Sequence, residues 1–220
     1  MPIIRGNNEI LITAIQKELK KKLPGRSYQY RMAPEDRDRR YAKIGNTEIP
    51  KQAGVMLLLF PSSGELSVVF VKRTIYSGAH SGQISFPGGT FSSKDENVFQ
   101  TAVRETEEEL GVHIPKMVKL GSLSPLFISV SNFRVSPFVG FIDKIPPIKV
   151  QETEIQFAFT ERLSVLHTKE TRGTFELKRG NDTLRAPCYL VKKEKIWGAT
   201  AMILSEFLEI WRRLNLNLKL

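Results

Sequence analysis

The amino-acid sequence predicts an α/β sandwich, in which helices cover a β-sheet. Apolar runs rich in β-branched residues predict strands at 55–60 and 66–72. Asp95 and Glu96 are predicted to open a helix with an apolar and an acidic side, which ends at Gly111. An apolar stripe at helical spacing predicts another helix over 200–214. Strands interleaved with helices in this way are typical of the α/β class.

An amphipathic helix is predicted near the N-terminus. Asn8 is its expected N-cap, Lys20, Lys21 and Lys22 lie in its last turn, and Pro24-Gly25 ends it. Its apolar side holds Ile12, Ile15, Leu19 and Leu23. We expect this helix to pack on the domain with a basic face in solvent, and the alternative is that its lysines attract a polyanionic substrate or RNA.

Between these helices the chain alternates strands and loops. The run Pro61-Ser62-Ser63-Gly64 predicts a hairpin loop, and 31–43 reads as an irregular approach without an apolar period. Further strands are predicted at 118–123, 135–142, 155–159 and 184–191, with a short helix over 161–167. The expected organisation is a basic helix and lead-in over 1–43 and a catalytic domain over 44–216.

Composition narrows the function classes. The net charge is +10. Residues 1–43 carry eleven basic and five acidic side chains, so six units of the excess precede the expected domain. The chain has no run of 18 uncharged apolar residues and no signal-peptide core at its start, which predicts a soluble, cytoplasmic protein. The single cysteine, Cys188, fits a reducing compartment and is expected to be a buried small hydrophobe.

The stretch 82–112 holds the expected chemistry. Gly88-Gly89 follows Phe86-Pro87 and is expected to turn tightly and bring bare backbone close to a ligand. Glu105, Glu108 and Glu109 share the acidic side of the following helix, where they repel one another by roughly 0.2 to 0.5 kcal/mol per pair. A bound divalent cation would reverse this penalty, because hard ions take carboxylate oxygens as ligands. Arg104 is placed to orient a neighbouring glutamate through a charge-assisted hydrogen bond.

An acidic run on a helix is more often a solvated face than a metal site. Here the run follows Phe-Pro-Gly-Gly by a short loop and closes with Leu-Gly-Val, and together these residues resemble the signature of the Nudix hydrolases. The residues in register are Glu96, Arg104, Glu105, Glu108, Glu109, Gly111 and Val112, while Thr106 stands where an apolar residue is usual. The resemblance implies an α/β/α sandwich with a mixed sheet, to which this chain adds an N-terminal helix.

The stretch Gly82 to Gly89 is similar to the coenzyme A pyrophosphatase branch of that superfamily. The extended pattern of the branch has an arginine where this chain has Gly78, followed two residues later by His80. The resemblance implies that Mg²⁺ or Mn²⁺ binds to Glu105, Glu108, Glu109 and Gly89, with Arg104 orienting Glu105. The expected substrate-binding residues are Arg73, His80, Gly82, Phe86 and Gly88, and the candidate general base is Glu154, after the Pro-Pro loop.

Three functions stay open at this point. The first is metal-dependent hydrolysis of coenzyme A or acyl-coenzyme A at the diphosphate, giving 3′,5′-ADP and (acyl)phosphopantetheine. The second, favoured by Gly78, is hydrolysis of another nucleoside diphosphate derivative, such as ADP-ribose or a dinucleotide polyphosphate. The third is a non-catalytic Nudix-like domain that binds RNA or a regulator. The expected partner is a small nucleotide diphosphate, not a membrane or a nucleic acid, and a homodimer is left open.

Overall fold

The structure is a computed structural model, which describes residues 3–35, 37, 49–78, 80–179 and 182–218. The expected domain boundary between residues 43 and 44 therefore lies outside the described residues. The helices are α1 (Ile3–Leu19), α2 (Arg26–Gln29), α4 (Val98–Leu110), α5 (Leu163–His167) and α6 (Gly198–Leu218), with 3₁₀ turns η1 (Tyr30–Met32) and η2 (Ser129–Ser131). No helix in this described part of the chain is long and apolar enough to cross a membrane.

The strands form two sheets. The larger sheet contains β1 (Lys51–Ser62), β2 (Glu65–Arg73), β3 (Ile84–Ser85), β4 (Gly88–Thr90), β5 (Val118–Ser122), β6 (Leu126–Ile128), β7 (Phe133–Phe141) and β8 (Ile155–Arg162). The smaller sheet contains β9 (Arg172–Arg179), β10 (Asp182–Val191) and β11 (Glu194–Trp197). Strands β1 and β7 pair in parallel and the other pairs are antiparallel, so the larger sheet is mixed.

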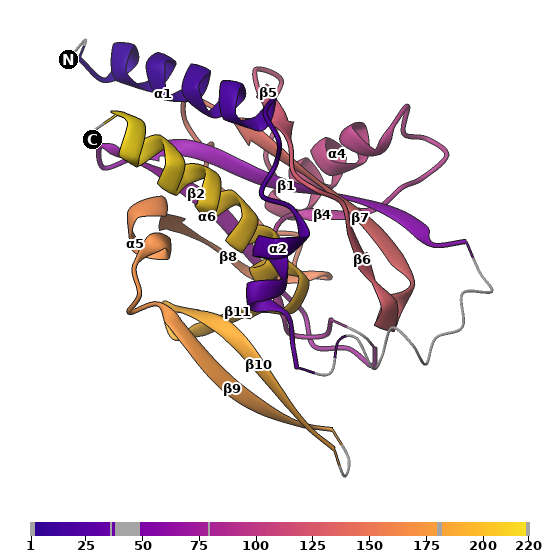
Figure 1. Ribbon diagram of the computed structural model, residues 1–220. Coiled ribbons are helices and arrows are strands. Elements are labelled where there is room, and N and C mark those ends of the chain that lie inside the picture. Colours follow the sequence, from indigo (N-terminus) through magenta and orange to yellow (C-terminus); the bar gives the residue numbers. More distant parts are fainter. Residues whose placement is uncertain (1–2, 36, 38–48, 79, 180–181, 219–220) are drawn as a thin grey trace.

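Strand β1 is buried on both faces. Its alternate residues Leu57 and Leu59 belong to one apolar cluster with α1 and α6, whereas Met56 and Leu58 belong to a second cluster with α4. The helices accordingly cover opposite faces of the larger sheet, as Figure 1 shows. The predicted α/β sandwich with a mixed sheet and an N-terminal helix is confirmed.

The predicted β1–β2 hairpin is present with a loop of two residues, Ser63 and Gly64, rather than four. Both residues have positive φ, 49° and 83°, as tight hairpin turns require. The strand therefore continues through Pro61 and Ser62, which pair with Leu66 and Glu65. Strands β3, β4, β6, β9 and β11 were not predicted, because they are short or lack a strong apolar alternation.

Helix α1 differs from its prediction at both ends. It begins at Ile3, so Asn8 lies inside the helix and is not its N-cap. It ends at Leu19, so Lys20 to Lys22 follow the helix instead of forming its last turn. The expected apolar side is confirmed: Ile15 and Leu19 are buried, and Ile12 and Leu23 pack against the same cluster.

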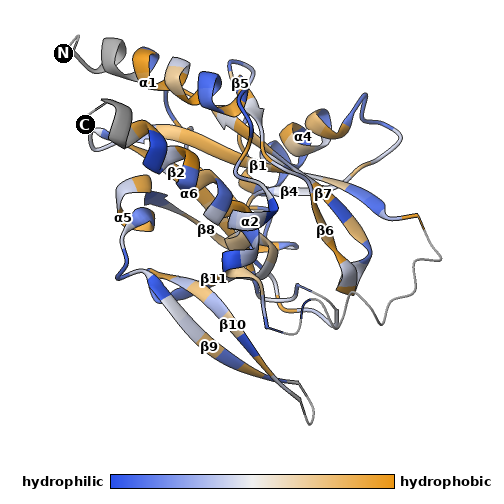
Figure 2. Ribbon diagram, in the orientation of Figure 1, coloured by the Kyte–Doolittle hydropathy of each residue, from blue (hydrophilic) through white to orange (hydrophobic). Residues whose placement is uncertain are grey.

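Helix α6 is the most deeply buried helix of the described chain, and Figure 2 shows hydrophilic and hydrophobic residues alternating along it. Its predicted core residues Leu204, Phe207, Leu208, Trp211 and Leu214 are all buried. The fully buried Glu206 accepts hydrogen bonds from the backbone of Gly25, the amide of Gln29 and the hydroxyl of Ser124. These donors offset the cost of burying a carboxylate and join α2 and the β5–β6 loop to α6. Cys188 is buried as predicted.

Candidate active site

Helix α4 is held by a cap at each end. The Asn97 side chain accepts hydrogen bonds from the amides of Phe99 and Gln100, at 3.0 and 3.1 Å, which begins the helix at Val98. The expectation that Asp95 and Glu96 open this helix is wrong, because both precede the Asn97 cap. The predicted C-cap is confirmed: Gly111 has the left-handed conformation, with φ 60°.

The three α4 glutamates predicted to bind metal, Glu105, Glu108 and Glu109, do not share one solvated face. Glu108 is exposed, whereas the Glu109 side chain is almost completely buried, so Glu109, although predicted on the acidic side of the helix, does not face solvent. The Glu109 carboxylate accepts a hydrogen bond of 3.1 Å from the amide of Gly88 on β4 and lies 3.3 Å from a guanidinium nitrogen of Arg73 on β2. At about 100° per residue, Glu109 lies about 40° from Glu105 around the helix, next to its apolar side, and strands β2 and β4 cover that edge.

Arg104 joins the turn before α4 to two of its glutamates. Its guanidinium makes two hydrogen bonds to the carboxylate of Asp95, at 2.8 and 3.1 Å, and these bonds hold the pKa of that carboxyl below its usual range. Its remaining terminal nitrogen, Nη1, lies 2.9 Å from Glu105 and 2.9 Å from Glu108. One planar group fixed by Asp95 thereby sets where both carboxylates lie.

Gly89 lies directly against Glu105. A Cβ atom at Gly89 would lie 2.4 Å from the carboxyl carbon of Glu105 and 2.5 and 2.7 Å from its oxygens. Gly88 and Gly89 do not form the expected tight turn; they begin strand β4, which pairs with β1. The absence of side chains here permits close approach of backbone and carboxylate, as glycine allows.

Burial gives two of these carboxylates unusual acidities. It raises the pKa of Glu109 to about 7, against the lowering effect of Arg73 and of the Gly88 amide. The pKa of Glu105 is also raised, mainly by burial, while Arg104 opposes the shift. A raised pKa means that the surroundings disfavour the negative charge, and a divalent cation would compensate it.

The carboxylates of Glu105, Glu108 and Glu109 are of the chemical type that binds a divalent ion. In this structure each of them is instead paired with an arginine. Within the described part of the chain no three histidine, cysteine, aspartate or glutamate side chains form a ready cluster for a metal. Instead, Arg73 lies on Glu109, and Arg104 lies on Glu105 and Glu108. Carboxylate oxygens are nevertheless the ligands that a hard divalent ion prefers. Two of these carboxylates, Glu105 and Glu109, are partly shielded from solvent, and Gly89 leaves the backbone beside Glu105 uncovered.

The acidity of Glu109 predicts how stability depends on pH without metal. Its folded-state pKa of about 7 lies above the ordinary value of 4.5, so the folded protein holds this proton more tightly than the unfolded chain does. The contribution to the free energy of unfolding is therefore present below pH 4.5 and lost as pH rises to about 7. We expect the Tm in EDTA to fall over this range, and the fall to be smaller in Glu109→Gln. Equal pH dependence of Tm in both proteins would contradict this acidity.

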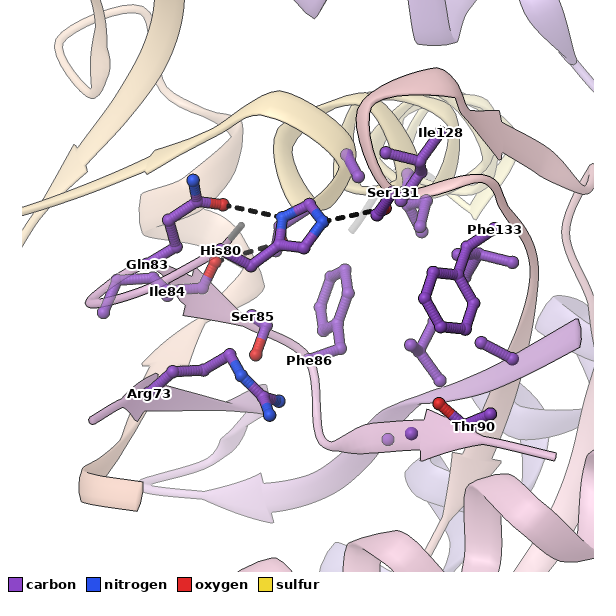
Figure 3. Close-up of a pocket in the computed structure, with 18 of the residues that line it drawn as sticks. Arg73, His80, Gln83, Ile84, Ser85, Phe86, Thr90, Ile128, Ser131 and Phe133 are labelled. Carbon is purple, nitrogen blue, oxygen red and sulfur yellow. Dashed lines mark hydrogen bonds between the residues drawn. The ribbon is translucent and has the colours of Figure 1, made fainter. Parts of the chain in front are cut away.

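A cavity of about 340 Å³ adjoins the glycine strand (Figure 3). Its walls come from β1, β2, the loop and strands that follow β2, the β6–β7 region and the start of α6. The lining residues include Val55, Arg73, Tyr76, His80, Gln83, Ile84, Ser85, Phe86, Gly88, Gly89, Thr90, Ile128, Ser131, Phe133, Ala199, Thr200 and Ile203. The wall is mostly apolar with a few convergent polar groups, a composition typical of small-molecule sites.

The structure brings most of the expected substrate-binding residues to this cavity. Figure 3 shows the His80 imidazole between Gln83 and Ser131, with hydrogen bonds of 3.2 and 3.1 Å. Arg73, Phe86 and Gly88 line the cavity as well. Gly82 does not line it; its φ of 63° closes the preceding loop, where its amide donates to the carbonyl of Thr74.

Glu154 lies in the loop before β8, with its side chain exposed. Its backbone carbonyl accepts a hydrogen bond of 2.8 Å from the amide of Thr74, next to Arg73. Its charge helps to raise the pKa of both Glu105 and Glu109, so its carboxylate lies within electrostatic range of these residues. A segment some 45 residues beyond the helix is thus folded back to the acidic site.

Sequence reasoning missed three contributors to the site. Asp95, expected only to open the helix, lies nine residues before Arg104 and forms a bidentate pair with it. Ser131 and Phe133 lie far from the glycine stretch in sequence, and nothing in their own neighbourhood distinguished them. They reach the cavity because β7 runs parallel to β1 and places its start beside Lys51 and Gln52.

Comparisons with known proteins agree with this fold. The sequence model of the family described as the NUDIX domain matches residues 50–183, more than half of the chain. Nudix hydrolase 3 of Caenorhabditis elegans is 28% identical over 183 residues, covering 76% of each chain. The protein named uncharacterized Nudix hydrolase NudL of Escherichia coli O1:K1 / APEC is 30% identical over 158 residues, covering 71% of this chain and 80% of its own.

Among solved structures, a MutT/nudix family protein from Enterococcus faecalis superposes with a TM-score of 0.52 at 17% identity, over 88% of this chain and 76% of its own. The MutT protein from Methanosarcina mazei Go1 superposes with a TM-score of 0.50 at 15% identity, over 77% and 99%. At these identities the likeness concerns the fold alone. Together with the family match and the identity to NudL, it shows that the chain belongs to the Nudix hydrolases, pyrophosphohydrolases that act on phosphoanhydride bonds and generally use divalent metal ions.

Proposed function

We propose that this protein hydrolyses the diphosphate of coenzyme A or acyl-coenzyme A, giving 3′,5′-ADP and (acyl)phosphopantetheine. The observation that carries the proposal is the position of the stretch 82–89, which resembles the coenzyme A branch. Residues 83–86, 88 and 89 of this stretch line the cavity, and Gly89 also lies against Glu105. The stretch thus connects a mostly apolar pocket to the acidic helix, as cleavage of a long substrate at its central diphosphate requires.

We propose that Glu105, Glu108 and Glu109, with the backbone of Gly89, hold Mg²⁺ or Mn²⁺. When bound, the ion neutralises phosphoryl charge and lowers the pKa of a bound water. Arg104 acts as a positioning residue, because its guanidinium contacts Glu105 and Glu108 while Asp95 fixes it. Because Gly89 has no side chain, its backbone would be open to an ion held by Glu105.

Glu154 is our candidate for the general base that takes a proton from the attacking water. Glu154→Gln should lower kcat without changing the metal concentration at half-maximal activity, because the metal-binding carboxylates stay intact. Arg104→Ala is the matched comparison and should raise that metal concentration, because Glu105 and Glu108 lose their common partner. Steady-state rates across a Mg²⁺ titration measure both effects. A raised metal requirement in Glu154→Gln, or an unchanged kcat, would remove Glu154 from this role.

Substrate choice depends on the 3′-phosphate that distinguishes coenzyme A from dephospho-coenzyme A. Among the described residues that line the cavity, Arg73 is the one with a permanent positive charge, and we propose that it contacts this phosphate, with an N-terminal lysine as the alternative. A charge-assisted hydrogen bond contributes roughly 1.5 to 3 kcal/mol. The kcat/KM for coenzyme A should therefore exceed that for dephospho-coenzyme A by about tenfold or more. Equal values would reject coenzyme A recognition.

The second candidate is hydrolysis of ADP-ribose or a dinucleotide polyphosphate. It is favoured by Gly78, which stands where the coenzyme A branch has an arginine and lies beside the Tyr76 ring, 3.0 Å from the Cβ that a substitution would add. Faster cleavage of ADP-ribose than of coenzyme A would support it. We further propose a cytoplasmic location, which the free, buried Cys188 thiol fits and fluorescence imaging of a tagged protein checks.

A further inference from the structure

A second cavity, of about 390 Å³, lies apart from the candidate active site. We call it the arginine pocket, because its lining includes Arg31, Arg172 and Arg212, together with Tyr28, His167 and Glu209. None of them lines the cavity beside the acidic helix. Its walls are formed by the segment α2–η1, the end of α5, the β9–β10 hairpin and α6. Figure 1 shows α2 beside α6, above this hairpin.

Positive charge predominates in the arginine pocket. Three guanidinium groups and one carboxylate line it, a surplus of two positive charges. The carboxylate, Glu209, is already satisfied: Arg212 makes two bonds of 2.8 Å to it and Arg213 one of 3.1 Å. These bonds lower the pKa of Glu209 to about 2, so it stays charged and neutralises only part of the cluster. Among the described residues, Arg31 and Arg172 form no ion pair.

The same pocket contains polar groups that can complete an anion site. The Nδ1 atom of His167 is buried without a hydrogen-bond partner in the described structure. A buried polar atom without a partner is costly, and a bound ligand or water would satisfy it. The guanidinium of Arg31 lies 3.8 Å over the ring of Tyr28, which limits its freedom before any ligand arrives. Less ordering is then needed on binding.

We propose that the arginine pocket binds a small organic molecule through a phosphate monoester group. A monoester carries about 1.5 to 2 negative charges at pH 7, which matches the surplus of two positive charges. Guanidinium groups bind phosphate oxygens bidentately, so arginine suits this group. Ligand pockets have volumes of roughly 300 to 1,000 Å³, and this cavity falls in that range, which leaves room for an organic part. The ring of Tyr28 and the side chains of Met32 and Leu208 offer apolar contact to that part.

The three histidines lie in different surroundings, so their signals can show which cavity a ligand enters. The chain has three: His167 lines the arginine pocket, His80 lines the candidate active-site cavity, and His113 is exposed beside Glu107. Their side-chain signals would be followed by heteronuclear NMR while glycerol 3-phosphate is added, in EDTA at constant ionic strength. Glycerol is the control without a phosphate. We expect saturable shifts of the His167 signals with glycerol 3-phosphate alone, with His113 unaffected.

Two charge-removing variants on one strand separate a built site from diffuse attraction. Arg172→Gln removes a lining guanidinium, whereas Lys178→Gln removes an exposed charge of β9 that does not line the pocket. Arg172→Gln should raise the Kd of glycerol 3-phosphate at least tenfold, and Lys178→Gln should change it less than twofold. Arg31→Gln provides a second lining variant should Arg172→Gln fail to fold. Equal weakening by both strand variants, shifts of His80 without His167, or no saturable shift of His167 would overturn the proposal.

Discussion

Glu109→Gln is expected to lower kcat about a hundredfold or more while leaving the protein folded. Removing one preorganised electrostatic group from a site typically costs this much. The fold should tolerate the change, because the Gln carbonyl can still accept the hydrogen bond of the Gly88 amide and the uncharged side chain suits a buried position. At pH 8 without metal the Tm should stay equal or rise, since burial disfavours the charged carboxylate. Steady-state kinetics and thermal unfolding in EDTA measure the two effects.

Glu107→Gln is the matched control for this variant. It removes the same charge from the same helix, but Glu107 contacts His113 and the amide of Ile114 rather than the site. Its kcat should remain within about twofold of the wild type, because the Glu107 carboxylate contacts none of the proposed metal-binding groups. Wild-type turnover by Glu109→Gln, or equal losses in both variants, would remove Glu109 from the catalytic centre.

Gly89→Ala should abolish most activity with little loss of stability. The new Cβ would lie 2.4 Å from the Glu105 carboxyl carbon, which is the far end of a flexible side chain. The carboxylate can therefore move aside without disturbing the backbone, so we expect a fall in kcat of about a hundredfold, as misplacement of a group by about 1 Å can cause. Activity and Tm measured on the same preparation separate the two effects.

Two other glycines frame this experiment. A Cβ at Gly173 would meet the end of the Leu190 side chain at 3.0 Å, so Gly173→Ala is a control with a milder side-chain contact away from the candidate active site. A Cβ at Gly88 would instead lie 2.3 Å from the backbone oxygen of Gly54, so Gly88→Ala should unfold the protein. If Gly89→Ala retained full activity, the close approach of the Glu105 carboxylate to the Gly89 backbone would not be required for catalysis.

The sequence predicted the sandwich because its strongest patterns are local. The apolar residues of β1 and β2, the stripe of α6 and the C-cap Gly111 each carry their information within a few residues. Strand β9 escaped prediction because half of its residues are charged and its apolar alternation is short. It pairs with β10 along its whole length, and that pairing depends on a partner elsewhere in the chain.

The candidate site was predictable in composition but not in arrangement. Glu105, Glu108 and Glu109 could be placed on one helix from their spacing, yet the burial of Glu109 depends on β2 and β4 crossing beside it. The proximity of Glu154 to the acidic residues likewise comes from a backbone hydrogen bond between distant loops. Helical periodicity fixes which side chains share a face, whereas tertiary packing decides which part of that face water reaches.

We propose that the protein hydrolyses coenzyme A at its diphosphate in a reaction that would require a divalent ion held by the acidic helix. The most direct test incubates the purified protein with coenzyme A and Mg²⁺ or Mn²⁺, and identifies the products by mass. We expect 3′,5′-ADP and phosphopantetheine from the wild type, neither product in EDTA, and product formation slower by about a hundredfold or more from Glu109→Gln. Intact coenzyme A with both ions, from protein shown to be folded, would contradict the account, as would the same products at the same rate in EDTA.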